Sequence, residues 1–284
     1  MKILAIETSC DDTSSSVVEN GNKVLSNIIS SQISVHAKYN GVVPELASRE
    51  HIKNVNIVVE QALQQAKISF ENFDKEIDYI TCTYGPGLAG SLLVGVMTAK
   101  TLSYIYKKPL IPVNHIEGHI FSAAIENKNL KTPFLAVVIS GGHTELVIIK
   151  DYGKYKFLGG TRDDACGEAF DKAAKILGLP YPGGPVIDKF AEQGNNEAVH
   201  FTRPMMKGTW DFSFSGIKTA VLNYSKKVVR KKQETINDIC ASFRQAIAET
   251  VVTKSVEAAK KYGLKSIALG GGVSCNSLIR KMFK

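Results

Sequence analysis

The pattern HIEGH at residues 115–119 places two imidazole side chains four residues apart. On a helix, residues at positions i and i+4 lie on one face, so the rings of His115 and His119 can converge on a transition metal without backbone strain. In an arbitrary HxxxH pattern the two residues are more often ordinary surface or core histidines. Here the pair follows the apolar strand LIPVN (110–114), and open α/β sheets bind ligands at strand ends, which favours a metal site.

A metalloprotease also spaces two histidines in this way, but its signature HExxH places a general-base Glu directly after the first histidine. In this sequence the Glu is Glu117, two residues after His115. At about 100° per residue, its side chain points roughly 200° away from that of His115. Gly118 weakens the helix further. The spacing therefore argues against a protease.

Three turns of small residues are suited to holding a phosphate or a carboxylate, because small side chains let backbone N–H groups approach an anion. The turns are ETSCDDT (7–13), ISGGHTE (139–145) and GGGVSCN (270–276). Hydroxyl groups of Thr8, Ser9 and Ser140 could add further donors. Tight hairpins without any ligand have the same composition, so each turn alone is a weak signal.

Polar side chains near these turns extend the candidate site. Asn276 stands where a helix should start, either as its N-cap or as a donor to a nucleotide. The segment PGGP (182–185) combines small residues with nearby carboxylates of Asp171 and Asp188, which could bind ribose hydroxyls. Together with the glycine turns, they predict a nucleotide-binding site.

Two acidic residues, Asp11 and Asp12, lie in the first turn. A carboxylate there could accept a proton, orient a nucleophile or hold a second cation. Aspartate is also common in solvated turns that have no function. The turn alone does not decide between these interpretations.

An internal repeat organises the chain. Residues 4–18 (LAIETSCDDTSSSVV) resemble residues 135–149 (LAVVISGGHTELVII), and each copy is an apolar strand, a turn and a second strand. A third strand follows each copy, at 24–29 and at 155–160. Coincidence between two hairpins is the alternative, but strands followed by helices, twice over, predict two similar α/β domains facing each other across a ligand cleft.

Hydrophobic periodicity predicts the remaining elements. Strands are expected at 77–83 and 110–114, and helices at 89–106, 115–125, 163–179 and 236–262. Gly178 and Gly263 stand where the last two of these helices should end. Residues 266–276 are expected to form a buried strand that leads into a glycine turn and a helix start. The Gly- and Pro-rich segment 180–216 is expected to be an ordered loop.

Composition limits the class of protein. With 284 residues, of which 44% are hydrophobic, the chain can bury a sizeable core, and its net charge of +8 permits a polyanionic partner. The basic run KKVVRKK (226–232) could contact nucleic acid, although such a run is more often a solvated helix face. Five scattered cysteines indicate reduced thiols, and the sequence shows neither a signal peptide nor a membrane span, so we expect a cytoplasmic protein.

Taken together, these segments resemble the universal tRNA threonylcarbamoyladenosine transferase family of the bacterial TsaD type, long described as glycoproteases. The matching segments run in order along nearly the whole chain: ETSCDDT, GVVPELASREH (41–51), GPGL (85–88), HIEGH, SGGHTEL (140–146), GEAFDKAAKILGL (167–179), YPGGP (181–185), DFSFSG (211–216) and GGGVSCN. The resemblance implies a duplicated α/β fold of the actin/sugar-kinase/Hsp70 type (ASKHA, RNase H-like). The repeat then places an N-terminal domain at 1–131 and a C-terminal domain at 132–284.

The resemblance also implies an activity and its partners. The family transfers a threonylcarbamoyl group from threonylcarbamoyl-AMP to N6 of adenosine 37 in tRNAs that read ANN codons. Bacterial members work with a non-catalytic paralogous subunit and a small P-loop ATPase. The expected cofactor is one iron (Fe²⁺) per subunit, with zinc as the alternative.

By match to the family's motifs, His115 and His119 take the metal positions, and Asp11 falls on an acidic position expected to be catalytic. The adenylate positions fall on a larger set of residues: Val138, Ile139, Ser140, Gly141, Gly142, Asp171, Gly184, Asp188 and Asn276. The family's third metal ligand is an Asp in a Thr-Asp-Asn-type motif beyond GGGVSCN, which these 284 residues do not include. A second departure is Asp12, where relatives often carry Glu.

Two further hypotheses remain open at the level of sequence. A phosphotransferase of the same fold, such as a sugar or acetate kinase, would need Mg²⁺ and oxygen ligands, which the HxxxH pair does not offer. A non-catalytic or truncated scaffold paralogue would bind partners without holding stoichiometric metal.

Overall fold

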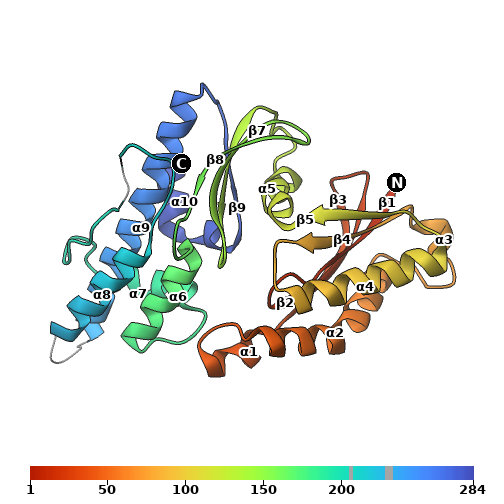
Figure 1. The fold of residues 1–284 in the computed structure, drawn as a ribbon, viewed down its shortest axis with the longest axis horizontal. Coiled ribbons are helices and arrows are strands. Elements are labelled where there is room, and N and C mark those ends of the chain that lie inside the picture. The colour runs from red at the N-terminus through yellow and green to blue at the C-terminus, as the bar shows by residue number, and fades with distance from the viewer. Residues whose placement is uncertain (205–206, 228–232) are drawn as a thin grey trace. The chain divides into compact units, whose positions relative to one another are not determined.

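The computed structural model describes residues 1–204, 207–227 and 233–284. The chain forms two compact units, Met1–Gly118 and His119–Lys284, each built on a mixed β-sheet (Figure 1). The division falls inside helix α5 (His115–Glu126), whereas the boundary expected from the repeat follows residue 131.

The first unit contains a five-stranded sheet of order β3-β2-β1-β4-β5. Strands β1, β2 and β3 form an antiparallel meander, and β4 and β5 run parallel to β1. Their bounds are β1 (Lys2–Glu7), β2 (Asp12–Glu19), β3 (Lys23–Ser31), β4 (Tyr79–Gly85) and β5 (Leu110–Asn114). Because β1, β4 and β5 are parallel, the segments ETSCDDT, GPGL and HIEGH all follow the same edge of this sheet.

Two long helices, α2 (Pro44–Gln65) and α4 (Ala89–Tyr106), pack on this sheet and on each other (Figure 1). Pro44 starts α2, a position where its missing N–H costs nothing. Val55, Val59 and Leu63 of α2 lie at helical spacing and join the core. Short helical segments complete the unit: α1 (Ile33–His36), η1 (Ala37–Tyr39) and α3 (Phe73–Glu76).

The second unit repeats the arrangement of the first four strands. Its sheet has the order β8-β7-β6-β9, with an antiparallel meander followed by β9, which runs parallel to β6. The strands are β6 (Phe134–Ile139), β7 (Thr144–Asp151), β8 (Lys154–Gly160) and β9 (Ile267–Gly270). The predicted three-strand repeat is therefore confirmed, and the parallel fourth strand extends it.

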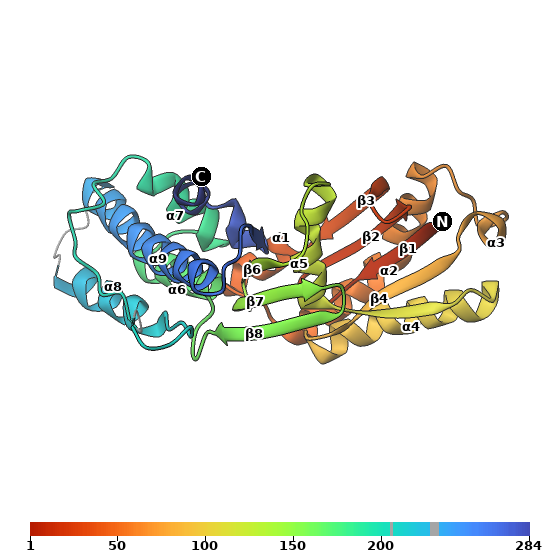
Figure 2. The ribbon, with the colours of Figure 1, turned by 90° about the horizontal axis from the view of Figure 1, so that it is seen from above.

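A large apolar core in the second unit joins one face of its sheet to a group of helices (Figure 2). The helices are α6 (Cys166–Leu177), α7 (Gly183–Ala191), α8 (Ser215–Lys227), α9 (Gln233–Lys261) and α10 (Ser277–Phe283), with a 3-10 turn η2 (Gly272–Cys275) before α10. Leu135, Val137 and Ile139 of β6 are fully buried in this core. The site elements of this unit thus rest on a rigid scaffold.

Most of the predicted elements are present with small shifts at their ends. Gly178 and Gly263 have positive φ angles and end α6 and α9 as predicted. The expectation of a loop over 180–216 is wrong in part, because α7 begins at Gly183 within PYPGGP. In the basic run 226–232, residues 228–232 lie outside the described residues, and Lys226 and Lys227 end α8.

The five cysteines form no disulfide, in agreement with the expected reduced thiols. Within the described ranges, every helix is too short or too polar to cross a membrane.

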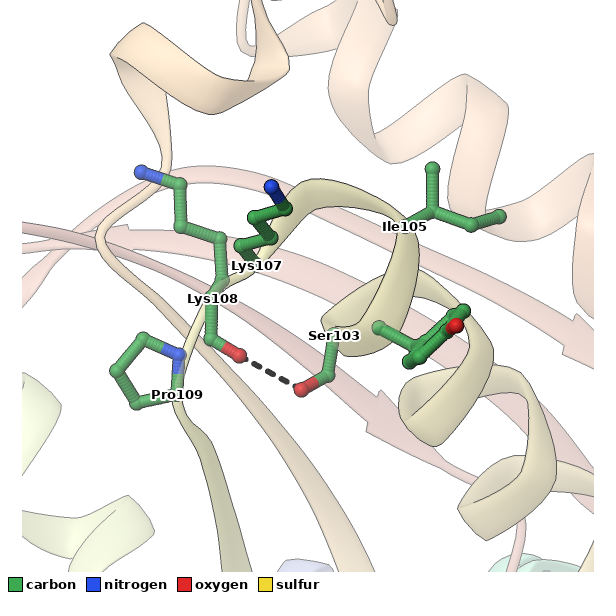
Figure 3. Close-up of a pocket in the computed structure, with 6 residues that line it drawn as sticks. Ser103, Ile105, Lys107, Lys108 and Pro109 are labelled. Atoms are coloured by element: carbon green, nitrogen blue, oxygen red, sulfur yellow. Dashed lines mark hydrogen bonds between the residues drawn. The ribbon is translucent and has the colours of Figure 1, made fainter.

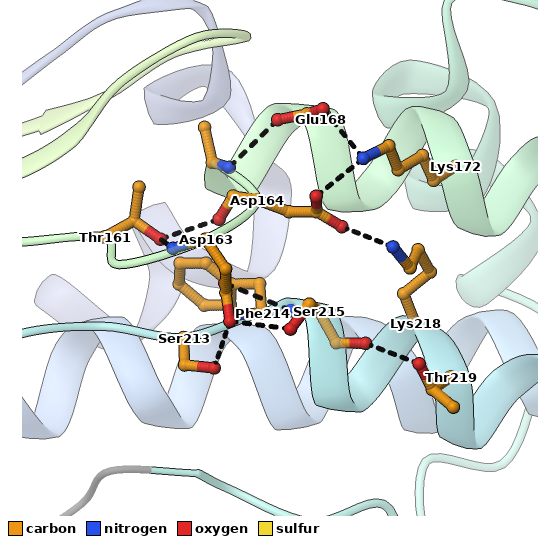
Figure 4. A network of polar contacts seen from close by, with 11 residues as sticks. Thr161, Asp163, Asp164, Glu168, Lys172, Ser213, Phe214, Ser215, Lys218 and Thr219 are labelled. Atoms are coloured by element: carbon orange, nitrogen blue, oxygen red, sulfur yellow. Dashed lines mark hydrogen bonds and ion pairs between the residues drawn. The ribbon is translucent and has the colours of Figure 1, made fainter.

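A polar network ties the start of α8 to the loop before α6 (Figure 4). The carboxylate of Asp163 accepts hydrogen bonds from the Ser213 and Ser215 hydroxyls and from the backbone N–H groups of Phe214 and Ser215. Partial burial acts to raise the pKa of Asp163, but these hydrogen bonds outweigh it and hold the pKa below its ordinary value. Asp163 thereby supplies the acceptors that the first turn of α8 lacks.

The network predicts a pH-dependent contribution to stability. Because the folded-state pKa of Asp163 is lowered, its contribution is fully present above the unfolded-state pKa and is lost progressively as the pH falls through the folded-state pKa. We expect Asp163→Asn to lower the free energy of unfolding at neutral pH by about 1–2 kcal/mol. Urea denaturation at neutral pH and at about pH 3 measures both effects, and an equal loss at the two pH values would contradict the assignment.

Candidate functional site

A cavity of about 420 Å³ opens in the second unit at the carboxyl end of β6. Five predicted adenylate residues line it: Gly141, Asp171, Gly184, Asp188 and Asn276. They come from the turn after β6, from α6, from α7 and from the start of α10, which are far apart in sequence. Phe170, Tyr181 and Val273 add apolar walls. Its volume and its mixture of apolar walls with few polar groups are typical of a small-molecule site.

Asp188 of α7 is held by side chains from two other helices. Its Oδ1 atom accepts hydrogen bonds from Arg244 of α9 at 2.8 Å, Asn276 at 3.0 Å and the Ser277 hydroxyl at 2.9 Å. Its Oδ2 atom accepts the backbone N–H of Ser277 at 2.9 Å. The carboxylate was expected to bind ribose, yet most of its acceptor capacity serves the protein. Asp188 therefore fixes the cavity wall in addition to lining it.

Asn276 combines the two roles that the sequence left open. Its side-chain oxygen accepts the N–H of Ile279 and so caps α10, while its amide nitrogen donates to Asp188. The side chain is almost fully buried, and it still lines the cavity. These bonds fix the amide in one orientation beside the ligand space.

Asp171 and Gly184 lie on the opposing elements α6 and α7. One oxygen of Asp171 accepts the N–H of Gly183 at 2.7 Å, the first residue of α7. A carboxylate at a helix N-terminus is stabilised by the unpaired N–H groups there. This bond explains why the PGGP segment starts a helix where the sequence predicted a loop.

The SGG turn after β6 contributes a glycine to the cavity, and its serine hydroxyl helps to close the turn. The N–H of Ser140 donates to the carbonyl of His143, and the Ser140 hydroxyl accepts the N–H of His143. The Ser140 hydroxyl thus closes the turn as an acceptor, and its expected role as a donor to a ligand stays a prediction. Gly141 and Gly142 are exposed at the tip, and Gly141 lines the cavity.

Val138 and Ile139 precede this turn as the last residues of β6. Both side chains are fully buried, and neither lines the cavity. Their backbone pairs with β7, and Val138 also pairs with Gly270 of β9. We conclude that they position the turn and that their side chains do not reach a ligand in the cavity.

The turn that contains Asp11 is held from two sides in the first unit. His51 of α2 contacts the Thr13 hydroxyl through Nδ1 at 2.8 Å and the Cys10 carbonyl through Nε2 at 3.0 Å. The carbonyl of Asp11 accepts the N–H of Gln32, so its backbone is fixed while its side chain is half-buried. Asp12 is exposed at the start of β2.

The Thr8 hydroxyl and the Ser9 carbonyl of the same turn stabilise the fold. Thr8 is buried, donates to the Ser91 carbonyl and accepts the N–H of Gly95, so its expected role as a donor to a ligand is wrong. The carbonyl of Ser9 accepts the N–H of Leu88. A Cβ atom on Gly87 would lie 2.6 Å from that carbonyl, so only glycine allows GPGL to come this close.

His115 is oriented by a carboxylate that sequence reasoning missed. Its Nδ1 atom lies 3.0 Å from the Ser9 hydroxyl and 3.5 Å from Oε2 of Glu7 at the end of β1. Burial acts to raise the pKa of Glu7, but hydrogen bonds from His115, Ser9 and Thr83 outweigh it and hold the pKa at about 2. An ionised carboxylate here favours the proton on Nδ1 and leaves Nε2 as the nitrogen that can bind a metal.

His119 follows one helical turn after His115 on α5 and is half-buried. Its carbonyl lies against the end of β9, where a Cβ atom on Gly270 would come within 2.2 Å of it. Within residues 1–204, 207–227 and 233–284, no three His, Cys, Asp or Glu side chains cluster as a complete metal site. The donor set that fits a metal is thus two imidazoles at helical spacing, one of them oriented by Glu7.

A second hollow lies at the end of α4 (Figure 3). It is lined by residues 103–105 and 107–109, among them Lys107 and Lys108. The Ser103 hydroxyl donates to the carbonyl of Lys108 and closes the helix end. None of the predicted site residues lines this hollow.

Comparison with known proteins identifies the family. The sequence model of the family described as tRNA N6-adenosine threonylcarbamoyltransferase (TsaD) matches residues 23–284. The protein of that name from Endomicrobium trichonymphae is 66% identical over 283 residues, which cover 100% of this chain and 83% of the relative. That of Clostridium kluyveri is 54% identical over 287 residues, with the same coverage. The chain belongs to this family.

Solved structures with little sequence identity confirm the predicted fold class of the actin/sugar-kinase/Hsp70 type. HypF from T. kodakarensis matches 99% of this chain and 43% of its own length, with a TM-score of 0.64 and 17% identity. Component A of the (R)-2-hydroxyglutaryl-CoA dehydratase from Acidaminococcus fermentans matches 99% of this chain and 87% of its own, with a TM-score of 0.55 and 14% identity.

The residues that the sequence did not reveal are Glu7, His51, Arg244 and Ser277. Each acts on a predicted site residue through a contact between segments that are distant in sequence. Glu7 stood in the quoted motif ETSCDDT and His51 in GVVPELASREH, but the contacts that they make with His115 and with the first turn were not visible there. Arg244 sits within a long amphipathic helix, where its charge resembles any solvated position.

The ion pair between Arg244 and Asp188 is mostly buried, which yields a stability prediction. Arg244→Met should lower the free energy of unfolding by about 2–4 kcal/mol, because it leaves the Asp188 carboxylate without its cation. The double variant Arg244→Met with Asp188→Asn should recover part of this loss. Chemical denaturation of the single and double variants gives the coupling, and strictly additive losses would contradict a direct interaction.

Proposed function

We propose that this chain transfers a threonylcarbamoyl group from threonylcarbamoyl-AMP to N6 of adenosine 37 in tRNAs that read ANN codons. The observation that carries the proposal is the cavity of the second unit, which gathers five predicted adenylate residues in a chain of this family. AMP is the leaving group, and one proton leaves the adenine amine.

The cavity is suited to an adenylate in both shape and chemistry. Phe170 and Tyr181 give apolar walls for a purine, and Asp171 and the Asn276 amide offer polar groups for a ribose. Glycines at the tip of the SGG turn let backbone N–H groups approach a phosphate or a developing oxyanion. Because the N–H of Ser140 donates to the His143 carbonyl, the N–H groups of Gly141 and Gly142 are the proposed donors to the phosphate or oxyanion.

His115 and His119 are the proposed ligands of one iron ion, with zinc as the alternative. A metal bound there would supply Lewis-acid polarisation of the carbamoyl carbonyl or orientation of the phosphate. Glu7 and Ser9 hold the His115 ring so that Nε2 is presented. The imidazole donors fit a transition metal better than the Mg²⁺ of a kinase.

Asp11 is the proposed acceptor of the proton from the adenine amine. Its turn is fixed by Gln32 and His51, and its side chain remains half-buried, as positioning of a general base requires. Holding the flipped adenine against the carbamoyl carbon supplies much of the rate, since it converts a bimolecular step into an intramolecular one.

The further partners and the compartment follow the family. We propose that the chain works with a non-catalytic paralogous subunit and a small P-loop ATPase, and that tRNA is its macromolecular substrate. The cytoplasm is the compartment where the tRNA substrate and reduced thiols coincide.

The decisive experiment combines transfer with metal analysis. The chain is incubated with its partner proteins, tRNA and threonylcarbamoyl-AMP, and modified adenosine is measured by mass spectrometry. His115→Ala and His119→Ala should each lower product formation by at least about 100-fold, as loss of a metal ligand does, and should lower the bound iron or zinc. The exposed His200 provides the control His200→Ala, which should change neither quantity.

Other outcomes separate the alternatives. A wild-type chain that neither holds stoichiometric metal nor transfers the group would indicate the scaffold hypothesis. Unchanged transfer by both histidine variants would refute the metal role while leaving the transferase activity intact.

A further inference from the structure

The hairpin that joins β7 to β8 carries an unusual run of exposed residues. All eight residues of 150–157 (KDYGKYKF) are exposed, and they contain three lysines, three aromatic residues and one acid. Tyr152 is 73% exposed and Phe157 is 61% exposed. A contiguous run of exposed aromatic side chains is typical of an interaction surface.

The aromatic rings are arranged as a surface. Tyr152 stacks on Phe121 of α5 with ring centroids 5.4 Å apart, and Tyr155 lies 6.4 Å from the same ring. Phe121 is half-buried, so it anchors the hairpin to the unit and leaves the outer face of Tyr152 open. Tyr155 and Phe157 alternate with Lys154 and Lys156 along β8, so the two aromatic residues lie on the face of the sheet toward Phe121 and the two lysines on the opposite face. Because β8 is an edge strand, both sets border the same open edge of the sheet.

More lysines gather at the same end of the sheet. The register pairs Phe134 with Ile149 and Leu135 with Ile267, so the segments that enter β6 and β9 lie beside the hairpin. Those segments carry further exposed lysines: Lys128, Lys131, Lys260, Lys261 and Lys265. Lys156 lies 4.7 Å from the ring centroid of Tyr262, which joins β8 to the end of α9.

Exposed lysines beside exposed aromatic rings suit a ligand that has both negative charge and planar rings. Lysines contact phosphates, and open aromatic faces stack on unpaired bases. We propose that this end of the second unit, the surface formed by residues 150–157 with the five neighbouring lysines, binds the phosphate backbone and unpaired bases of tRNA. The inference rests on the proposed function, which supplies tRNA as the substrate, and it adds the surface that holds it.

The surface lies at the opposite end of β6 from the cavity, so we expect it to contribute to tRNA binding and not to the reaction itself. Strand β6 begins at this end and runs to Ile139, after which the SGG turn lines the cavity. Six residues of strand span roughly 20 Å, so the surface touches a part of the tRNA away from the base in the reaction. Loss of the surface should therefore weaken tRNA binding and raise its KM without lowering kcat at saturating tRNA.

The test measures tRNA affinity of the full chain at several salt concentrations by filter binding. The triple variant Lys150→Ala, Lys154→Ala, Lys156→Ala should bind about tenfold more weakly and should lower the slope of log K against log salt by about two to three. The variant Tyr152→Ser with Phe157→Ser should also bind about tenfold more weakly, but with an unchanged slope. Thermal melting checks that both variants are folded.

Matched changes on exposed residues of the first unit provide the control. Lys75→Ala with Tyr104→Ser removes one exposed lysine and one exposed aromatic there, and it should leave tRNA affinity unchanged. AMP binding should be the same in all these variants.

Different outcomes would refute the tRNA-binding surface and the proposed transferase function. If the wild-type chain fails to bind tRNA, or if the hairpin variants bind tRNA within about twofold of it, the surface is refuted. Loss of binding to a partner protein at unchanged tRNA affinity would refute it as well. A wild-type chain that binds tRNA through this surface but transfers no group would instead refute the proposed function alone.

Discussion

The carboxylate of Asp188 is the point on which the candidate nucleotide site depends. Arg244, Asn276 and Ser277 all donate to it, and they come from α9 and from the start of α10, while Asp188 itself belongs to α7. Burial of a carboxylate is costly unless its oxygens are paired, and here they are. The network therefore specifies one arrangement of three helices around the cavity. The hydrogen bond to Asp188 also fixes the orientation of the Asn276 amide.

Both units position their candidate site residues at the carboxyl ends of parallel strands. In each unit a parallel pair of strands ends at one end of the sheet, and short turns of small residues follow: ETSCDDT and GPGL in the first, SGG and GGGVSCN in the second. HIEGH, which starts α5, follows β5 at the same end of the first sheet. Apolar strands and helices give these turns a rigid base. His51 then fixes the first turn and Glu7 orients the His115 ring. Many of the polar side chains near the candidate site therefore hydrogen-bond to other residues of the protein.

Local patterns predicted the strands, the repeat, the helices α4, α5, α6 and α9 and the start of α10, because periodicity and glycine caps act within a few residues of sequence. The helices α2 and α8 were not predicted. The helix α7 was missed, since its start depends on Asp171, a contact from another element. The structural role of Asp188 was missed for the same reason: the side chains that donate to its carboxylate were not visible in the sequence. Glu7 and Arg244 act over 108 and 56 residues of sequence, a range at which no spacing rule operates.

The claim that the cavity of the second unit holds the adenylate is tested most directly by a structure of the chain with AMP bound. We expect AMP to lie against Gly184, Asp171 and Asn276, with its phosphate at the Gly141–Gly142 tip, and the Arg244–Asp188 pair to remain intact beneath it. AMP bound at another site, or a cavity left empty at saturating AMP, would contradict the account.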